Sequence, residues 1–279
     1  MAVMVVTDST ADLPPELVKN FGVTVVPAYT RFGEQVFRDG IDITRDQFYQ
    51  RLLSDPIHPS TIQPSPQDFI ETYNRLDEEG AEGIISIHVS TKLSGTCNSA
   101  LQAKEAVATK CPIAVVDSRF VSMALGILVL EAARMARSGK KLDEMAAAIE
   151  NTIPRIQLLI CFDTLKYLAL GGRIGKVKAL LGSVLSVKPI AAIKDGQLVP
   201  SGQVRTRKKG VEKLLEFARN ARDIQELAVI YSTTPDDASE LADAIGAYFP
   251  REHIYLTQLG SAVGVHAGPG VLGVGIRES

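Results

Sequence analysis

The sequence predicts an α/β protein of two domains, with a mostly parallel sheet flanked by helices in the first and a mixed sheet in the second. Three observations support this. In the first half, short apolar runs that indicate buried strands alternate with helix-like segments. In the second half, an Asp-Gly pair at 195–196 joins two strand-like runs into a hairpin, which adds antiparallel pairing. With 279 residues, 46% of them hydrophobic, the chain has material for two cores.

Capping residues and glycines mark where the strands and helices of the first half begin and end. Thr44 and Gln47 form a capping-box pattern that opens a helix, and Ser65 followed by Pro66 opens another. Gly22 ends a short helix before the second strand. The expected strands are 3–6, 23–28, 84–89 and 113–116, and the expected helices are 14–20, 44–53, the helix opening at Ser65, 97–108 and 123–137.

The second half begins with a helix, and we place the domain boundary near Pro154, which divides the chain into 1–154 and 155–279. A helix at 165–170 breaks at the glycine-rich segment 171–175. The hairpin pairs 187–193 with 197–204. The other expected helices are 142–152, 208–219 and 236–248, and the other expected strands are 156–162, 227–231 and 254–258.

Composition and charge exclude several classes of function. The formal net charge of −2 lacks the positive field expected of a general nucleic-acid binder. The three cysteines are widely spaced, and the four histidines show no metal-ligand spacing, so we expect neither disulfides nor a metal or other cofactor. The opening residues lack a basic segment, and the longest apolar stretch, 123–130, is too short to cross a bilayer. We therefore expect a soluble cytoplasmic protein without an integral membrane segment.

Three polar segments fall where α/β proteins place their ligands, in loops beyond the carboxyl ends of strands. They are 60–66 (Ser-Thr-Ile-Gln-Pro-Ser-Pro), 90–96 (Ser-Thr-Lys-Leu-Ser-Gly-Thr) and 264–270 (Gly-Val-His-Ala-Gly-Pro-Gly). The second segment combines hydroxyls, a glycine and a helix start, a combination that suits a carboxylate or a phosphate. The alternative is an ordinary capped turn, and His266 in the third segment is either a site residue or a structural one.

Other catalytic patterns are weak or missing. No Walker A sequence is present, and Ser94 lacks the glycine two residues before it that a nucleophile elbow requires. The compact basic run 205–209 (Arg-Thr-Arg-Lys-Lys) is either a solvated helix start or a docking surface for an anion or a partner.

Taken together, the polar segments carry a resemblance. The motifs occur in this order: Thr-Asp-Ser-Thr at 7–10, Thr-Ile-Gln-Pro-Ser-Pro at 61–66, Leu-Ser-Gly-Thr-Cys-Asn-Ser-Ala at 93–100, Gly-Gly-Arg-Ile-Gly at 171–175, Val-Arg-Thr-Arg at 204–207, and the histidine segment at 264–270. The set resembles the DegV family, bacterial fatty-acid-binding proteins that serve as the acyl-binding subunit of fatty acid kinase. The resemblance covers essentially the whole chain.

The resemblance implies a DegV-like fold of two domains that bury a long-chain fatty acid at or near their interface, together with a separate kinase subunit as partner. It implies that Thr61, Ser94 and His266 hold the carboxylate, with Gly95 and Thr96 in the same loop as Ser94. It associates Arg173 and Arg205 with the head-group entrance and the kinase-facing surface, and Arg207 lies in the same basic motif.

Two positions depart from the family pattern. Ile62 stands where relatives often carry serine, which removes a possible hydroxyl contact but leaves Thr61. Cys97 replaces a common tyrosine on the following helix.

The leading hypothesis is a binding protein that catalyses no reaction of its own, and two other functions remain as alternatives. One is an enzyme acting on a small carboxylate or phosphate ester, with Ser94 as nucleophile and His266 as base. The other is a DNA-associated regulator that uses the basic run 205–209, which the net charge makes unattractive.

Overall fold

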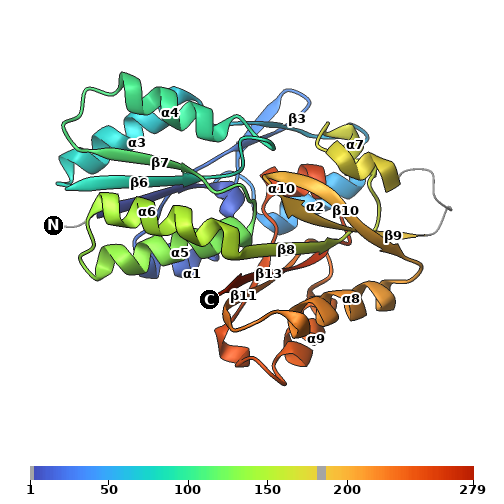
Figure 1. Ribbon diagram of the computed structural model, residues 1–279. Coiled ribbons are helices and arrows are strands. Elements are labelled where there is room, and N and C mark those ends of the chain that lie inside the picture. Colours follow the sequence, from blue (N-terminus) through green and yellow to red (C-terminus); the bar gives the residue numbers. More distant parts are fainter. Residues whose placement is uncertain (1–2, 181–186) are drawn as a thin grey trace.

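A computed structural model describes residues 3–180 and 187–279, so the opening residues Met1 and Ala2 lie outside the described part (Figure 1). The described chain forms three sheets, of four, six and three strands. All strands of the four-stranded sheet precede Pro154, and all strands of the six-stranded sheet follow it.

The four-stranded sheet is parallel throughout, in the order β2-β1-β6-β7. Figure 1 shows α3 and α4 on one face of this sheet and α5 and α6 on the other. Because both faces are covered, β6 is buried along its whole length, as its β-branched sequence predicts. The bounds are β1 Val3–Asp8, β2 Thr24–Val26, β6 Gly83–His88, β7 Ile113–Asp117, α3 Pro66–Glu78, α4 Thr96–Ala106, α5 Met123–Arg137 and α6 Leu142–Thr152.

The six-stranded sheet is mixed, in the order β10-β9-β8-β13-β11-β12, and only β11 and β12 pair in parallel. The hairpin turn has φ 50° at Asp195 and 77° at Gly196, the positive values of the predicted tight turn. The bounds are β8 Ile156–Cys161, β9 Lys188–Lys194, β10 Gln197–Val204, β11 Ile224–Tyr231, β12 Ile254–Gln258, β13 Leu272–Glu278, and, packed on one face, α8 Arg207–Asn220 and α9 Pro235–Ile245.

Helix α5 is the layer that joins the two large sheets. Residues 123–130 of this helix are fully buried, because its apolar surface extends most of the way around its axis. One continuous core holds α5 together with Val5 and Ile87 of the parallel sheet and with Ile160 and Ala228 of the mixed sheet. The apolar stretch that is too short for a membrane is therefore an internal helix, and no helix in residues 3–180 or 187–279 is long and apolar enough to cross a membrane.

A small antiparallel sheet, in the order β4-β3-β5, was not expected from the sequence. It packs with α2 and α10 in a separate apolar cluster that contains Phe32, Phe48 and Val265. This cluster brings α10, from the end of the chain, against segments from its beginning. The bounds are β3 Tyr29–Phe32, β4 Gln35–Arg38, β5 Ser60–Ile62, α2 Arg45–Ser54 and α10 Ser261–Ala267.

Most predicted elements are present within a residue or two, and both predicted caps, Thr44 and Ser65, form complete capping boxes. Two of the three expected ligand loops differ. Residues 60–62 form strand β5, and residues 264–267, which include His266, lie in helix α10 rather than in a loop. The sequence does not predict this helix, because its residues are mostly small and Gly264 has a low helix propensity.

Candidate functional site

A cavity lies between the two large sheets, with about 890 Å³ of empty space including its mouth. Segments from both halves of the chain line it, among them the ends of β5 and β8, the loop that follows β6, and one face of α10. Most of its wall is apolar. The apolar lining residues are Ala28, Ile62, Val89, Leu93, Val121, Ile160, Phe162, Leu168, Leu198, Ala262, Val263 and Ala267.

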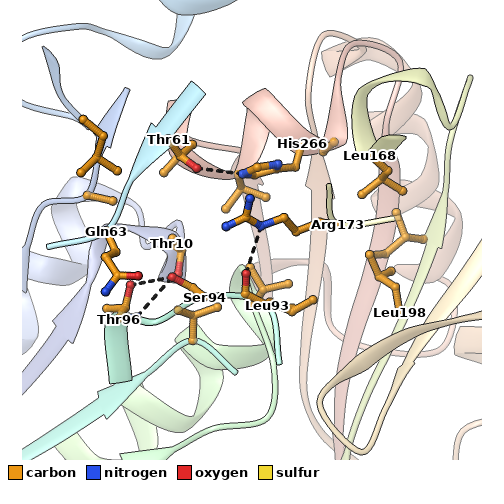
Figure 2. A pocket seen from close by; sticks show the side chains of 18 of the residues that line it. Thr10, Thr61, Gln63, Leu93, Ser94, Thr96, Leu168, Arg173, Leu198 and His266 are labelled. Atoms are coloured by element: carbon orange, nitrogen blue, oxygen red, sulfur yellow. Dashed lines mark hydrogen bonds between the residues drawn. The ribbon is translucent and has the colours of Figure 1, made fainter. Parts of the chain in front are cut away.

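Thr61 and His266 meet at the polar end of this cavity. Figure 2 shows the two side chains pointing toward one another, and their Oγ1 and Nε2 atoms are 2.9 Å apart. Thr61 lies on β5 and His266 on α10, more than 200 positions later in the sequence. The sequence motifs therefore predicted two residues that the fold does bring into contact.

The imidazole of His266 packs against the backbone of Gly171, at the end of helix α7 (Lys166–Leu170). A β-carbon on residue 171 would overlap Nδ1 of the ring, so only glycine leaves room for it. Nδ1 is buried and has no hydrogen-bond partner among the described residues. Burial, followed by the nearby charges of Arg173 and His58, lowers the pKa of His266 to about 4. The ring is therefore neutral at pH 7.

The tautomer of His266 follows from these contacts. With the hydrogen on Nε2, the ring donates to Oγ1 of Thr61 and avoids an unpaired N–H at the buried Nδ1. The hydroxyl hydrogen of Thr61 is then free to donate to a ligand.

Ser94 and Thr96 form a second pair of hydroxyls in the same wall. Their oxygens are 2.9 Å apart, and the Thr96 amide donates to Oγ of Ser94 at 3.3 Å. Gly95 between them is the N-cap of α4 and has no side chain of its own, so the Ser94 hydroxyl is the acceptor for the first amide of the helix. A β-carbon on Gly95 would overlap Oε1 of Gln63, whose amide nitrogen donates to Ser99 at 3.1 Å. A side chain at position 95 would therefore force the amide end of Gln63 to move and would disturb its contact with Ser99.

Arg173 is the cationic side chain of the cavity wall. Its Nε donates to the Leu93 carbonyl at 3.3 Å, and one terminal nitrogen donates to the Gly171 carbonyl at 2.8 Å. Figure 2 places it between His266 and Leu93. The side chain is exposed, so it stands at the mouth of the polar end and leaves its remaining donors available to an anion.

The two arginines of the basic run have different surroundings. Arg207 contacts Asp237 at 2.7 Å, Thr234 at 2.9 Å and the Gly270 carbonyl at 2.5 Å, which ties α8 to α9 and to the segment before β13. Arg205 is exposed and has no hydrogen bond or ion pair to any of the residues that the structure describes. Lys209 is paired with Glu212. Two of the four cations of the run, Arg207 and Lys209, are therefore paired with carboxylates.

Several lining residues were not expected from the sequence as site residues. Thr10 lines the cavity, and its hydroxyl donates to Oδ1 of the buried Asp8. Gln63 and Gly171 also belong to the site; the glycine pair at 171–172 was the available signal. The departing residue Ile62 lines the cavity, whereas Cys97 is buried in α4 outside the lining.

The enzyme hypothesis required Ser94 and His266 to form a hydrogen-bonded pair. No such hydrogen bond exists among the described residues, since Ser94 pairs with Thr96 and His266 with Thr61. A hydroxyl–imidazole–carboxylate chain does occur elsewhere, from Ser86 through His88 to Asp8, with distances of 2.7 and 2.9 Å.

That chain resembles a catalytic triad in geometry, but Asp8, Ser86 and His88 are each 0% exposed. The Tyr73 hydroxyl also donates to the Ser86 oxygen, at 2.9 Å. No substrate can reach the serine, so this network is structural: it holds Asp8, which in turn holds Thr10 at the cavity wall.

Fold and site together define a class of protein: an α/β protein with two large sheets and a mostly apolar cavity whose polar end carries hydroxyls and a neutral imidazole. A family model described as "Uncharacterised protein, DegV family" matches residues 2–279. The chain belongs to the DegV family.

Curated relatives and solved structures agree with this assignment. A DegV domain-containing protein of Streptomyces coelicolor is 39% identical over 98% of this chain and 97% of its own length. The structure of a fatty-acid-binding DegV family protein from Thermus thermophilus is similar over the whole of both chains, with 33% identity and a TM-score of 0.91. A stearic-acid-binding protein from Eubacterium ventriosum is 29% identical, with a TM-score of 0.89 over 99% of this chain and 98% of its own.

Proposed function

We propose that this protein is a fatty-acid carrier that buries a long acyl tail in the cavity and presents the carboxylate to a separate kinase for acyl-phosphate formation. One observation carries the proposal: an apolar cavity that ends at a cluster of hydroxyls and an imidazole from three segments distant in sequence. Relatives of the same fold are described as fatty-acid-binding proteins. On this proposal the chain itself performs no turnover.

The energetics of such a ligand divide between tail and head group. Each buried methylene is worth about 0.8 kcal/mol, so a long acyl chain gains roughly 10 kcal/mol before the costs of binding. The carboxylate leaves water and needs hydrogen-bond donors to replace it. Thr61, Ser94 and Thr96 supply hydroxyls, and Arg173 supplies a positive charge at the mouth. The tail therefore provides affinity and the head-group residues provide selectivity for an acid.

We further propose that 1–154 and 155–279 act as two domains that enclose the acyl chain, since lining residues come from both halves. Arg205, which is exposed and has no ion pair among the described residues, is the proposed contact for the kinase, and Arg207 shapes that surface by fixing the start of α8. We assign the protein to the cytoplasm, a compartment that keeps buried thiols such as Cys97, Cys111 and Cys161 reduced.

The direct test is mass spectrometry of the ligand extracted from protein purified from bacterial cells. We expect a long-chain fatty acid in stoichiometric amount. A small phosphorylated compound in its place would favour the enzyme hypothesis and contradict the carrier.

The head-group assignment has its own test. Ser94→Ala and Thr61→Val each remove one hydroxyl and should each weaken fatty-acid binding by about 1.5–3 kcal/mol without unfolding the protein. Because both hydroxyls are proposed to hold one carboxylate, the double variant should be non-additive. Unchanged affinity in either single variant would remove that residue from the site.

Kinase presentation separates from binding in two further variants. Arg205→Glu should reduce acyl-phosphate formation by a fatty acid kinase and leave fatty-acid affinity nearly intact. Lys208→Glu, the same charge change three positions along, is the control for a general electrostatic effect. Equal loss in the Arg205 and Lys208 variants would contradict a specific contact at Arg205.

His266→Ala should impair phosphorylation more than ligand retention, because the tail stays buried.

A further inference from the structure

The beginning of helix α10 is held by two carboxylates from the first half of the chain. The Gly260 amide donates to Oδ1 of Asp12 at 2.7 Å. The amide and the hydroxyl of Ser261 both donate to Oδ1 of Asp39 at 2.8 Å. Asp12 follows the 3-10 turn Ser9–Ala11, and Asp39 follows β4. The helix that carries His266 is therefore anchored at its start by side chains that lie more than 200 positions earlier in the sequence.

The two carboxylates are close together and out of contact with water. A β-carbon on Gly260 would lie 3.0 Å from Oδ1 of Asp12 and 3.1 Å from both oxygens of Asp39, so both groups face the same point. Asp12 is 1% exposed and Asp39 is 6% exposed. In each residue Oδ2 is buried and has no hydrogen-bond partner among the described residues. Two buried oxygens without a donor, on neighbouring carboxylates, form an arrangement that a single proton would stabilise.

We propose that Asp12 and Asp39 are positioning residues for the acyl site, and that a proton held by this pair keeps α10, and with it His266, in place. The acyl part of this inference rests on the proposed function. A proton on Asp12 removes the repulsion between the two carboxylates and gives one of the unpaired oxygens a hydrogen to donate. The helix then keeps both of its amide contacts without two adjacent buried charges.

The groups around the pair favour this protonation. Burial raises the pKa of Asp12 to about 7, opposed by the charge of Arg45, the nearby Ser122 hydroxyl and the Gly260 amide, while the charge of Asp39 raises it further. From α2, Arg45 also reaches the Asp12 and Leu13 carbonyls at 3.4 Å. The buried Tyr49 of α2 is neutral, because burial and both carboxylates raise its pKa, and Tyr231 of β11 lies near it. Arg45 is thus the one cation that the described residues place against Asp12.

Displacement of α10 would change the cavity directly. Ala262, Val263 and Ala267 of this helix line the apolar wall, and His266 holds Thr61 at the polar end. When Asp12 loses its proton, the two carboxylates repel each other, and the helix start is the contact that can yield. We therefore expect weaker and faster-exchanging acyl binding as the pH rises through 7.

The test compares the pH dependence of binding in the wild type, Asp12→Asn and Asp46→Asn. Asparagine keeps the shape of Asp12 and imitates its protonated form, and Asp46 is an exposed acid on the neighbouring α2. Binding of a fluorescent long-chain fatty acid is measured between about pH 6 and 8, above the pKa of His266. We expect the Kd of the wild type and of Asp46→Asn to rise about fivefold or more, and that of Asp12→Asn to stay constant.

Asp39→Asn provides a second route if Asp12→Asn folds poorly, because it also removes the repulsion and should also be independent of pH in this range. A pH profile of Asp12→Asn or Asp39→Asn that follows the wild type would overturn the proposal. So would a wild type whose Kd does not change.

The ligand-free protein provides a readout that does not depend on fatty-acid binding. The NMR signals of the His266 ring should change as the wild type is titrated through pH 7 and should not change in Asp12→Asn. If no variant binds a fatty acid but this difference is present, the proposed function fails and the positioning role stands. If binding occurs and the His266 signals of both proteins are the same, the positioning role fails alone.

Discussion

At the scale of single residues, the site depends on glycines as much as on polar side chains. Gly171 leaves the space that the His266 ring occupies, and Gly95 leaves the space for Gln63. Neither requires an unusual backbone: φ is −80° at Gly171 and −81° at Gly95. A side chain at position 171 would therefore not fit, and one at position 95 would force the flexible end of Gln63 to move, whereas many glycines are needed for their conformational freedom.

Gly171→Ala should consequently disable the head-group site while the protein stays folded. The added methyl group displaces the imidazole and breaks its contact with Thr61, so we expect fatty-acid affinity to fall by about 1–3 kcal/mol. Binding measurements and thermal unfolding on the same variant separate the two effects.

The control for this prediction is the His266→Ala background. Without the ring there is nothing to displace, so Gly171→Ala should have little further effect on binding in that background. Equal losses in both backgrounds would show that Gly171 acts by another route.

At the scale of elements, the sequence predicted what apolar patterns and caps encode and missed what tertiary contacts create. Helix α5 was predicted with both ends correct, because its apolar run has a helical length and ends in arginines. Strand β13 was missed: its glycines at 273 and 275 weaken the strand preference, but Gly273 packs tightly against Ile230 of β11. The predicted residues Thr61, Ser94 and His266 all line the cavity, whereas the apolar wall cannot be distinguished from ordinary core in a sequence.

The β9–β10 hairpin gives a prediction at this scale. Its tip docks on the loop after β6, where the Ser90 hydroxyl donates to the Gly196 carbonyl at 2.8 Å. A β-carbon on Gly196 would lie 2.5 Å from that hydroxyl oxygen. Gly196→Ala should therefore push the hairpin off the loop, lower the free energy of unfolding, and speed the release of a fatty acid, because Leu198 of the hairpin lines the cavity.

Gly139→Ala is the matched control. Gly139 has the same φ of 77° but no atom within 4 Å of a β-carbon, so it reports the backbone strain alone, about 1 kcal/mol. A loss in Gly196→Ala that is no greater than in Gly139→Ala would mean that hairpin docking contributes nothing. Urea unfolding and stopped-flow ligand release measure the two consequences.

At the scale of the whole molecule, two perturbed groups give stability opposite dependences on pH. The pKa of Asp12 is raised to about 7, so the folded protein binds more protons than the unfolded chain between about pH 4 and 7, and this group lowers stability as pH rises there. The pKa of His266 is lowered to about 4, so the unfolded chain binds more protons between about pH 4 and 6.5, and this group raises stability with pH. The two contributions oppose each other across most of the acid range.

Single variants should reveal these hidden slopes. The compared quantity is the slope of the free energy of unfolding against pH. Near pH 5, this slope should be more positive in Asp12→Asn than in the wild type, by about 1 kcal/mol per pH unit. His266→Ala should shift the slope by a similar amount in the opposite direction. Urea unfolding at several pH values measures both, and parallel profiles in all three proteins would contradict the opposed contributions.

The position of β13 has a consequence for how the protein is made. This strand lies between β8 and β11 in the middle of the mixed sheet, yet it follows both of them in the sequence and so leaves the ribosome after them. Domains generally fold from the N-terminus during synthesis, so the parallel sheet can assemble early. At that stage β8 and β11 each have one edge unpaired, because β13 has not yet been made. Strand β8, which carries the lining residue Ile160, has no partner on that side until Leu272–Glu278 arrives. We therefore expect a chain truncated before β13 to expose two unpaired strand edges, which favour aggregation.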